Sequence, residues 1–381
     1  MPNNYFQRFS LLTFLLFSAI SLTAQNSIKP TFNNSTIYTG IEVGSKGVKM
    51  SVIEIGKNAQ TNGAFNILKD TSVNTDFISF TDVTFQATLK GLCDLYNTAE
   101  VEYKVPAKNI FTVISSGVKM QAEKDTKQTW VNNLIDSFRV NIKDPNRKVE
   151  IIDVKEEGRL SHLGIIPDSR RYSTFLIDIG SGNTKGGFFP YGNTKDFKLF
   201  QINWGTKSTT NATNKNCGED QTLENYNKQL FRILAGAENS EIIYAVNSSG
   251  AYPVSDNVAV SGGIAWAVAT LMHPEMIDKN IIPVSYAELE KFSSKLYNNF
   301  DALSPSFLTV NINLAEDKQA AFKQLTTVHK VFDQKAMMAG VGLLLKIFRQ
   351  FESSFGGKQF FLIKNGQVGW VSAYVDQNVA K

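Results

Sequence analysis

The sequence has few cysteines and histidines, and this excludes some kinds of chemistry. Its 381 residues include two cysteines, Cys93 and Cys217, and three histidines. Neither cysteine lies in a CxxC motif or beside a histidine, and the histidines share no ligand spacing, so zinc and thiol catalysis are not expected. Whether the two cysteines pair depends on their distance in the fold, which the sequence leaves open.

The chain also lacks a strong excess of charge. Its formal net charge is +4, and no Lys/Arg run is interleaved with aromatic residues. A nucleic-acid partner is therefore not expected. With 381 residues and 43% hydrophobic composition, the chain is long and apolar enough for a large core and, most simply, two domains.

No apolar run is long enough to span a bilayer, but the N-terminus resembles a secretory signal. Arg8 precedes an apolar run over residues 11–20, and small residues follow over residues 21–25. We expect residues 1–25 to be a signal peptide, the protein to be secreted or periplasmic, and no membrane span to remain after cleavage. An uncleaved anchor is the alternative, and a lipoprotein is not expected because no cysteine follows the apolar run.

One stretch, TFLIDIGSGNTKGGFF over residues 174–189, combines an apolar strand, the acid Asp178, a turn of small residues and a second strand. Backbone N–H groups on such a turn are able to hold phosphate oxygens, and an acid just before it suits a metal. An ordinary β-hairpin is the alternative. A second copy, YTGIEVGSKGVKMSVIEI over residues 38–55, carries Glu42 and a Gly44-Ser45-Lys46-Gly47 turn. Two such hairpins facing each other predict a clamp for a polyphosphate or nucleotide.

The remaining pattern predicts a mixed sheet flanked by helices in each half. We expect strands over residues 65–67, 110–114, 148–154, 197–203, 242–246, 258–261, 359–363 and 368–374, the last two joined by a turn at Asn365-Gly366. Helices are expected over residues 82–99, 124–138, 155–163, 223–234, 264–272 and 334–351, with another capped by Ser285. Loops are expected over residues 205–221 and 299–317.

In this order and spacing, the chain resembles the exopolyphosphatase and guanosine pentaphosphatase family of the actin, hexokinase and sugar-kinase superfold. The first phosphate motif of the family is similar to Gly40-Ile41-Glu42-Val43-Gly44-Ser45, and the second phosphate motif of the family is similar to residues 178–184. Three further family segments resemble Ile114 to Lys119, the Glu-Glu segment Lys155-Glu156-Glu157-Gly158-Arg159-Leu160, and residues 258–272, while its closing helix and strands resemble residues 332–374. The resemblance implies an α/β fold of two ribonuclease-H-like (actin-like) domains with mixed five-stranded sheets, flanking helices and a ligand cleft between them. The expected domains are residues 36–170 and 171–360, followed by closing strands and a tail over residues 361–381.

The resemblance also implies a hydrolase and its site. Glu157 would activate a water that attacks a terminal phosphorus in line, and Glu42 and Asp178 would hold Mg²⁺ or Mn²⁺. The residues expected to bind phosphate are Gly44, Ser45, Lys46, Ser116, Lys119, Gly180, Ser181, Gly182, Asn183, Thr184 and Lys185. The implied partner is a small or polymeric phosphate substrate, such as polyphosphate or a phosphorylated nucleotide, and a homodimer is possible.

Several positions depart from the family pattern. Lys185 stands where the family has a glutamate, and its positive charge would repel a metal cation or bind phosphate directly. Ser181 and Asn183 replace a glycine and a serine of the motif. Three alternatives stay open: an apyrase-like nucleoside di- and triphosphate hydrolase, which Glu156-Glu157-Gly158 also resembles; a phosphate- or nucleotide-binding protein without turnover; and a filament-forming protein.

Overall fold

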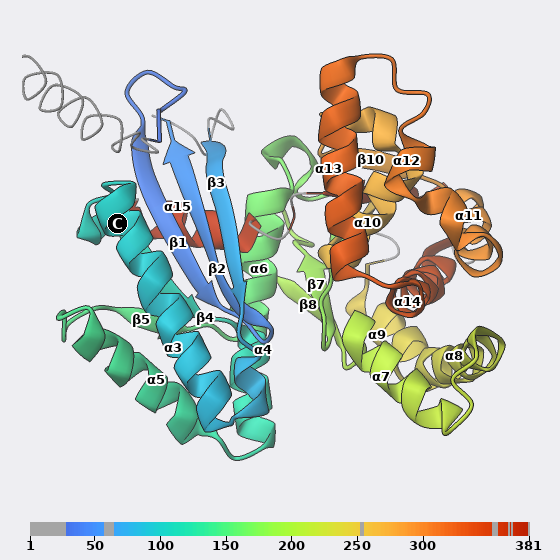
Figure 1. Cartoon of the computed structure of the whole chain (residues 1–381), viewed down its shortest axis with the longest axis horizontal. Coiled ribbons are helices and arrows are strands. Elements are labelled where there is room, and N and C mark those ends of the chain that lie inside the picture. The colour runs from blue at the N-terminus through green and yellow to red at the C-terminus, as the bar shows by residue number, and fades with distance from the viewer. Residues whose placement is uncertain are drawn as a thin grey trace, which may run out of the picture.

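The structure is a computed structural model of the chain, and it describes residues 28–56, 65–251, 255–352, 357–364, 366 and 369–379. The expected signal peptide, residues 1–25, and Asn365 of the expected turn lie outside the described residues. The described part forms two halves, each built on one sheet, with helix α6 (Val154–Ile165) between them (Figure 1).

The first sheet has five strands in the order β3-β2-β1-β4-β5 among the described residues. Strand β1 pairs with β2 in antiparallel register and with β4 in parallel register. Apolar side chains such as Ile41 and Met50 are fully buried, and the centres of β1 and β2 are buried on both faces of the sheet. The strands are β1 (Thr36–Val43), β2 (Gly47–Ile55), β3 (Phe65–Asn74), β4 (Ile110–Ile114) and β5 (Val149–Ile151), and the helices are η1 (Phe77–Ser79), α3 (Asp82–Asn97), η2 (Thr98–Glu102), η3 (Ala107–Asn109), α4 (Ser116–Lys124) and α5 (Gln128–Asn141).

The second sheet repeats this arrangement and adds one strand, in the order β10-β11-β9-β6-β7-β8. The expected mixed α/β, actin-like architecture is confirmed, with a sixth strand, β10, that the resemblance did not include. The strands are β6 (Thr174–Ile179), β7 (Thr184–Phe188), β8 (Lys198–Ile202), β9 (Asn257–Ser261), β10 (Ile281–Val284) and β11 (Gln359–Ile363). The helices are η4 (Asp168–Arg170), α7 (Thr206–Cys217), α8 (Leu223–Ala237), η5 (Glu238–Ile242), α9 (Ile243–Ser249), α10 (Gly263–Met272), η6 (Pro274–Met276), α11 (Tyr286–Asn298), η7 (Phe300–Leu303), α12 (Pro305–Leu308), α13 (Ala315–Val331) and α14 (Gln334–Glu352).

The last helix returns from the second half of the chain to the first. Helix α15 (Gly369–Val379) packs against α6 (Val154–Ile165) and β1, behind the first sheet in Figure 1. Trp370, Val371 and Tyr374 are buried there with Val113 and Leu160. Because α6 also touches β7 of the second sheet, α6 and α15 together join the two halves.

Four expected segments were wrong. The expected closing strand over residues 368–374 is part of helix α15, whose buried Trp370, Val371, Tyr374 and Val375 follow a helical period. The expected loop over residues 205–221 contains helix α7. The expected strand over residues 242–246 is helical, since η5 runs directly into α9. The expected loop over residues 299–317 contains η7, α12 and the start of α13.

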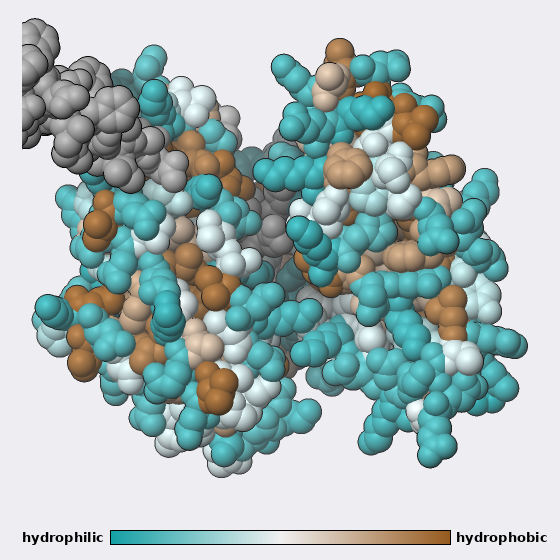
Figure 2. All heavy atoms as spheres, viewed as in Figure 1, coloured by the Kyte–Doolittle hydropathy of each residue, from teal (hydrophilic) through white to brown (hydrophobic). Residues whose placement is uncertain are grey.

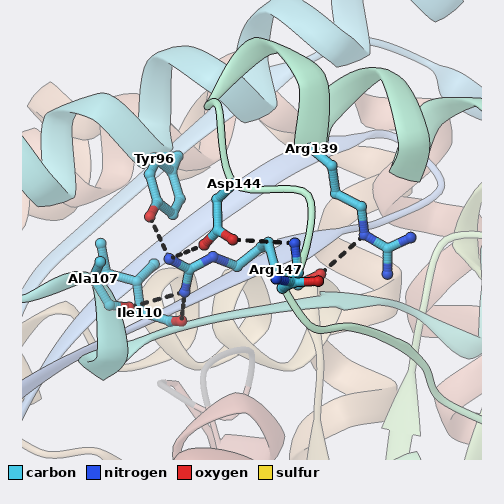
Figure 3. Close-up of polar contacts among 7 residues, drawn as sticks. Tyr96, Ala107, Ile110, Arg139, Asp144 and Arg147 are labelled. Atoms are coloured by element: carbon cyan, nitrogen blue, oxygen red, sulfur yellow. Dashed lines mark hydrogen bonds and ion pairs between the residues drawn. The ribbon is translucent and has the colours of Figure 1, made fainter.

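The turn before β5 is fixed by one arginine (Figure 3). The guanidinium of Arg147 donates to the Tyr96 hydroxyl at 2.7 Å and the Ala107 carbonyl at 2.9 Å, and pairs with Asp144 at 2.9 Å. The carbonyl of Arg147 in turn accepts from Nε of Arg139 at 3.0 Å. These contacts position β5, which leads into α6 and therefore places Glu157.

Figure 2 shows the surface hollowed between the two halves. Cys93 and Cys217 lie on α3 and α7, in different halves, and both are free thiols, so the question of their pairing is resolved. Among the described helices, none combines the length and the apolar character that crossing a membrane requires.

The contact between α6 and α15 depends on a glycine, which gives a first prediction. A Cβ added at Gly164 would lie 1.8 Å from the carbonyl oxygen of Gly369, so Gly164→Ala would force the two helices apart. We expect this substitution to lower the free energy of unfolding by about 1–3 kcal/mol, measured by urea denaturation. Gly236→Ala is the matched control, because the exposed Gly236 in α8 has no atom within 4 Å of an added Cβ. The control should raise stability by about 0.5–1 kcal/mol. Equal effects of the two substitutions would contradict the role given to the helix contact.

Candidate active site

Each sheet places one turn of small residues at the junction of the halves. In the first turn, Gly44 and Gly47 exchange backbone hydrogen bonds of 2.8 and 3.3 Å. In the second, the N–H of Gly180 donates to the carbonyl of Asn183 at 3.0 Å. Among the described residues, no hydrogen bond engages the backbone N–H groups of Ser45 and Lys46 in the first turn or of Ser181 in the second. These groups are therefore available to an anion.

Helix α7 holds the second turn from behind. The N–H groups of Thr206 and Lys207, at the start of α7, donate to the carbonyls of Gly180 at 3.0 Å and Ser181 at 2.8 Å. A Cβ on Gly205 would lie 2.6 Å from the Gly180 carbonyl, so only glycine allows this close approach. The carbonyls of the turn thus face the helix and not a bound anion.

The two turns are connected through helix α4. A Cβ on Gly117 would lie 2.9 Å from Oγ of Ser45, which shows how closely α4 approaches the first turn. One turn further along the same face of α4, Met120 Sδ lies 3.9 Å from the side-chain nitrogen of Asn183. Asp76 and Lys207 also meet across the junction, at 4.0 Å. The two hairpins therefore border one shared space.

Lys185 lies at the centre of this space. Its ammonium pairs with Oε1 of Glu157 at 2.8 Å and with Oδ2 of Asp178 at 3.6 Å, and both the lysine and Glu157 are buried. Asp178 and Lys185 are directly opposed in the β6–β7 register, so the hairpin itself sets their separation. Burial alone would lower the pKa of Lys185, but the nearby Glu157, Asp178 and Glu42 outweigh it and raise that pKa above its ordinary value.

Glu157 has both carboxylate oxygens engaged. Oε2 accepts from the backbone N–H of Ser116 at 2.7 Å, and Oε1 faces Lys185. Burial would raise the pKa of Glu157, but the Lys185 charge and these hydrogen bonds hold it below the usual range. Glu157 is therefore ionised at neutral pH. A carboxylate oxygen accepts more than one hydrogen bond, so a water is able to join these donors.

Glu42, at the end of β1, completes the cluster. Burial raises the pKa of this carboxyl group, and Glu157 and Asp178 add to the effect against the opposing charges of Lys49 and Lys185. Lys46, at the edge of the cluster, has its pKa lowered by burial and by the like charges of Lys207 and Lys49. Four positive charges, from Lys46, Lys49, Lys185 and Lys207, therefore act on or among these groups, and positive charge of this kind favours an anion.

The residues expected to hold a divalent metal do not fit one as they stand. Oδ1 of Asp178 accepts from the Ser261 hydroxyl at 3.2 Å, and Oδ2 faces Lys185. No group of three or more His, Cys, Asp and Glu side chains suited to a metal ion occurs among the described residues. The ammonium of Lys185 lies where a cation between Asp178 and Glu157 would lie. The expected Mg²⁺ or Mn²⁺ site at Glu42 and Asp178 is thus already neutralised in part by the chain.

The structure brings most of the sequence-predicted site residues together. Gly44, Ser45, Lys46, Gly180, Ser181, Gly182 and Asn183 lie on the two turns, and Glu42, Ser116, Glu157, Asp178 and Lys185 form the cluster. Thr184 is buried and its hydroxyl donates to the Trp204 carbonyl at 2.7 Å, so that hydroxyl has a structural partner. Lys119 is part-exposed and lies 3.9 Å from Glu123, on the next turn of α4.

Sequence reasoning missed the residues that support the cluster from elsewhere. Ser261 ends β9 and Gly262 follows it, and a Cβ on Gly262, where φ is +99°, would lie 2.9 Å from Oδ1 of Asp178. The Gly262-Gly263 pair after a strand was a visible signal for such a close approach. Lys207 was placed in a loop and gave no such signal.

The fold and the site together define an actin-like protein of two sheet-based halves, with one turn of small residues from each half facing a shared space. No protein-family model matches the sequence, and no curated protein matches it. Among solved structures, the chain is similar to a Ppx/GppA phosphatase of Aquifex aeolicus in its type II variant, with a TM-score of 0.61 and 16% identity over 90% of this chain and 99% of that one. A second structure of the Aquifex aeolicus family member gives a TM-score of 0.58 and 17% identity over 90% and 99%.

An exopolyphosphatase from Cytophaga hutchinsonii is also similar, with a TM-score of 0.53 and 14% identity over 90% of this chain and 98% of that chain. These matches cover nearly the full length of each protein. The resemblance to the exopolyphosphatase and guanosine pentaphosphatase family is therefore confirmed at the level of the fold.

Removal of the central ammonium should destabilise the protein. Lys185→Met leaves Glu157 buried without its counter-charge, and loss of one partner of a buried pair costs about 3–5 kcal/mol. In the wild type, the lowered pKa of Glu157 means that its ionised form contributes to the free energy of unfolding, and this contribution is lost only as pH falls through that pKa. The raised pKa of Lys185 means that its protonated form also contributes to the free energy of unfolding, and this contribution is lost only as pH rises through the pKa of Lys185. The ion pair is therefore intact from about pH 5 to 9.

In Lys185→Met the buried carboxyl group should instead favour its protonated form, so the variant gains stability as pH falls from 8 to 5. Urea denaturation at several pH values measures both effects. Lys90→Met is the control: Lys90 forms an exposed pair with Asp94, and its loss should cost less than about 1 kcal/mol. A Lys185→Met variant with wild-type stability and a flat pH profile would contradict the importance of the pair.

Proposed function

We propose that the protein is a phosphoanhydride hydrolase that releases the terminal phosphate of polyphosphate or of a phosphorylated nucleotide. The observation that carries this proposal is the position of Glu157. Its carboxylate touches Ser116 beside the first phosphate turn and Lys185 of the second hairpin, so it lies where the two turns converge. The full-length likeness to the Aquifex aeolicus phosphatase structures and the Cytophaga hutchinsonii exopolyphosphatase supports the same class.

The chemistry requires a water positioned in line with the bond that breaks. The water oxygen forms a bond to the terminal phosphorus, and the bond from that phosphorus to the bridging oxygen breaks with its electron pair on the leaving phosphate. Glu157 accepts a hydrogen bond from the water and takes its proton, which passes to solvent. Because its pKa is low, Glu157 contributes mainly by orienting the water, which is the larger part of catalysis in phosphoryl transfer.

The turns and Lys185 would hold the phosphates. The free N–H groups of the two turns face phosphate oxygens, and the Lys185 ammonium neutralises charge that builds up on the transferred group. A divalent metal, which the family resemblance implies, would supply the same neutralisation if bound. Asp178 and Glu157 already have hydrogen-bond partners in this chain, so no step of the proposed reaction depends on a metal.

A second candidate is a protein that binds phosphate chains or nucleotides without turnover. The ion pair between Lys185 and Glu157 favours it, since the pair lowers the basicity of the one carboxylate placed to activate water. Tight ligand binding without phosphate release would distinguish this candidate from the hydrolase.

Glu157→Gln tests the hydrolase proposal. The amide keeps the shape of the side chain but removes the charge that orients the water, so we expect phosphate release to fall by at least 10²-fold. The measurement is phosphate released from polyphosphate, nucleoside triphosphates, nucleoside diphosphates and pyrophosphate. Glu156→Gln is the matched control, because Glu156 pairs with Arg159 at 2.7 Å instead of joining the cluster, and it should retain activity. Unchanged phosphate release in Glu157→Gln would overturn the role of this residue.

Export of the protein is part of the proposal and rests on residues 1–25. A reporter that is active only outside the cytoplasm, fused after residue 40, should be active. Leu16→Arg interrupts the apolar run of the segment and should abolish reporter activity. A reporter that stays inactive with the natural segment would overturn the proposed export.

A further inference from the structure

Two of the three carboxylates at the centre have each oxygen either hydrogen-bonded by this chain or facing the Lys185 ammonium. Glu157 faces Lys185 at 2.8 Å and accepts from the Ser116 N–H at 2.7 Å. Asp178 faces Lys185 at 3.6 Å and accepts from the Ser261 hydroxyl at 3.2 Å. Mg²⁺ needs oxygen ligands at about 2.0–2.1 Å in near-octahedral geometry. A metal on either oxygen that faces Lys185 would lie a few ångströms from the ammonium and be repelled by it.

The position of the ammonium is built into the fold. Lys185 is opposed to Asp178 in the β6–β7 ladder, so both side chains project from the same face of the sheet. Thr184 beside it is anchored by its hydroxyl to the Trp204 carbonyl at 2.7 Å. The Lys185 side chain is 9% exposed, so it does not move into solvent without opening the junction. The cation is therefore a fixed part of the site.

The ammonium also retains hydrogen-bonding capacity. A lysine has three N–H donors, and among the described residues only the contact with Glu157 is short enough for a hydrogen bond, since Asp178 lies at 3.6 Å. In the β6–β7 ladder, Lys185 is adjacent to the Ile179–Thr184 pair that closes the turn carrying Ser181. A phosphate oxygen bound to that turn is thus able to accept a hydrogen bond from one of the remaining donors directly.

We propose that Lys185 is the resident cation of the cleft, that it takes the place of a divalent metal, and that the ligand bound is the metal-free phosphoanhydride anion. This inference rests on the proposed function for the choice of ligand. The inference adds to the proposed function that the phosphate chain enters without Mg²⁺. A metal-dependent site would instead bind the complex of the phosphate chain with Mg²⁺.

The first experiment uses the wild-type protein and inorganic tripolyphosphate. Calorimetry should show that the protein binds tripolyphosphate in EDTA at least as tightly as in excess Mg²⁺, because Mg²⁺ only competes with the protein for the anion. A tenfold or greater loss of affinity in EDTA would overturn the inference. Titration of Mn²⁺ alone, followed by electron paramagnetic resonance, should show no specific site in the wild type, and a stoichiometric site would also overturn it.

The second experiment uses Lys185→Glu, which replaces the ammonium by a fourth carboxylate. This variant should lose at least tenfold in tripolyphosphate affinity in EDTA, gain one Mn²⁺ site, and recover affinity with Mn²⁺. Lys207→Glu makes the same change of charge at a half-exposed position near Asp76 and should weaken tripolyphosphate binding without creating a metal site. A Mn²⁺ site in both variants would contradict the special position of Lys185. If Lys185→Glu does not fold, the wild-type titrations decide alone.

The outcomes separate this inference from the proposed function. Tight binding of tripolyphosphate in EDTA without phosphate release under any condition supports the resident cation and overturns the hydrolase. Phosphate release that occurs only with Mg²⁺ or Mn²⁺ supports the hydrolase and overturns the resident cation.

Discussion

The buried pair between Lys185 and Glu157 is the interaction on which the rest of the site depends. Glu157 comes from α6, which follows the first sheet, and Lys185 comes from β7 of the second, so this 2.8 Å ion pair is a buried contact between the two halves. The pair also brings the backbone of Ser116 toward Asp178, each of which touches one partner. A buried ion pair adds little to the free energy of unfolding compared with an apolar contact of similar size. Its geometry nevertheless fixes how the two turns lie relative to each other.

The same pair shapes the chemistry available to the protein. A carboxylate with a lowered pKa orients water well but accepts its proton weakly, so any turnover must come from positioning and from stabilised charge. An ammonium carries one charge on a flexible stem, whereas Mg²⁺ carries two and fixes six oxygens. The protein compensates with the sheet register, which holds the ammonium opposite Asp178. Preorganisation by strands thus replaces preorganisation by a metal.

The sequence predicted the parts of the fold that local pattern decides. The hairpins at Glu42 and Asp178 follow from alternating apolar residues around turns of small residues, and both occur. Helix α7 was not predicted, because its Thr- and Asn-rich composition is typical of loops. Its threonines bond to carbonyls four residues back, as Thr213 does to Thr209, and its first N–H groups hold the Gly180 turn. Helix α15 needs the glycine contact with α6, which no local pattern shows.

The candidate site was predicted as a set of residues but not as a set of contacts. Lys185 was recognised as a charge reversal beside Asp178, since the two are hairpin partners. Its stronger partner, Glu157, could not be predicted, because the approach of α6 to β7 depends on packing between the halves. The rim follows the same division, because Lys46 and Lys207 come from different halves, and the charge of Lys207 is one of the causes that lower the pKa of Lys46. A coupling of this kind depends on how the halves pack against each other, so no local pattern in the sequence predicts it.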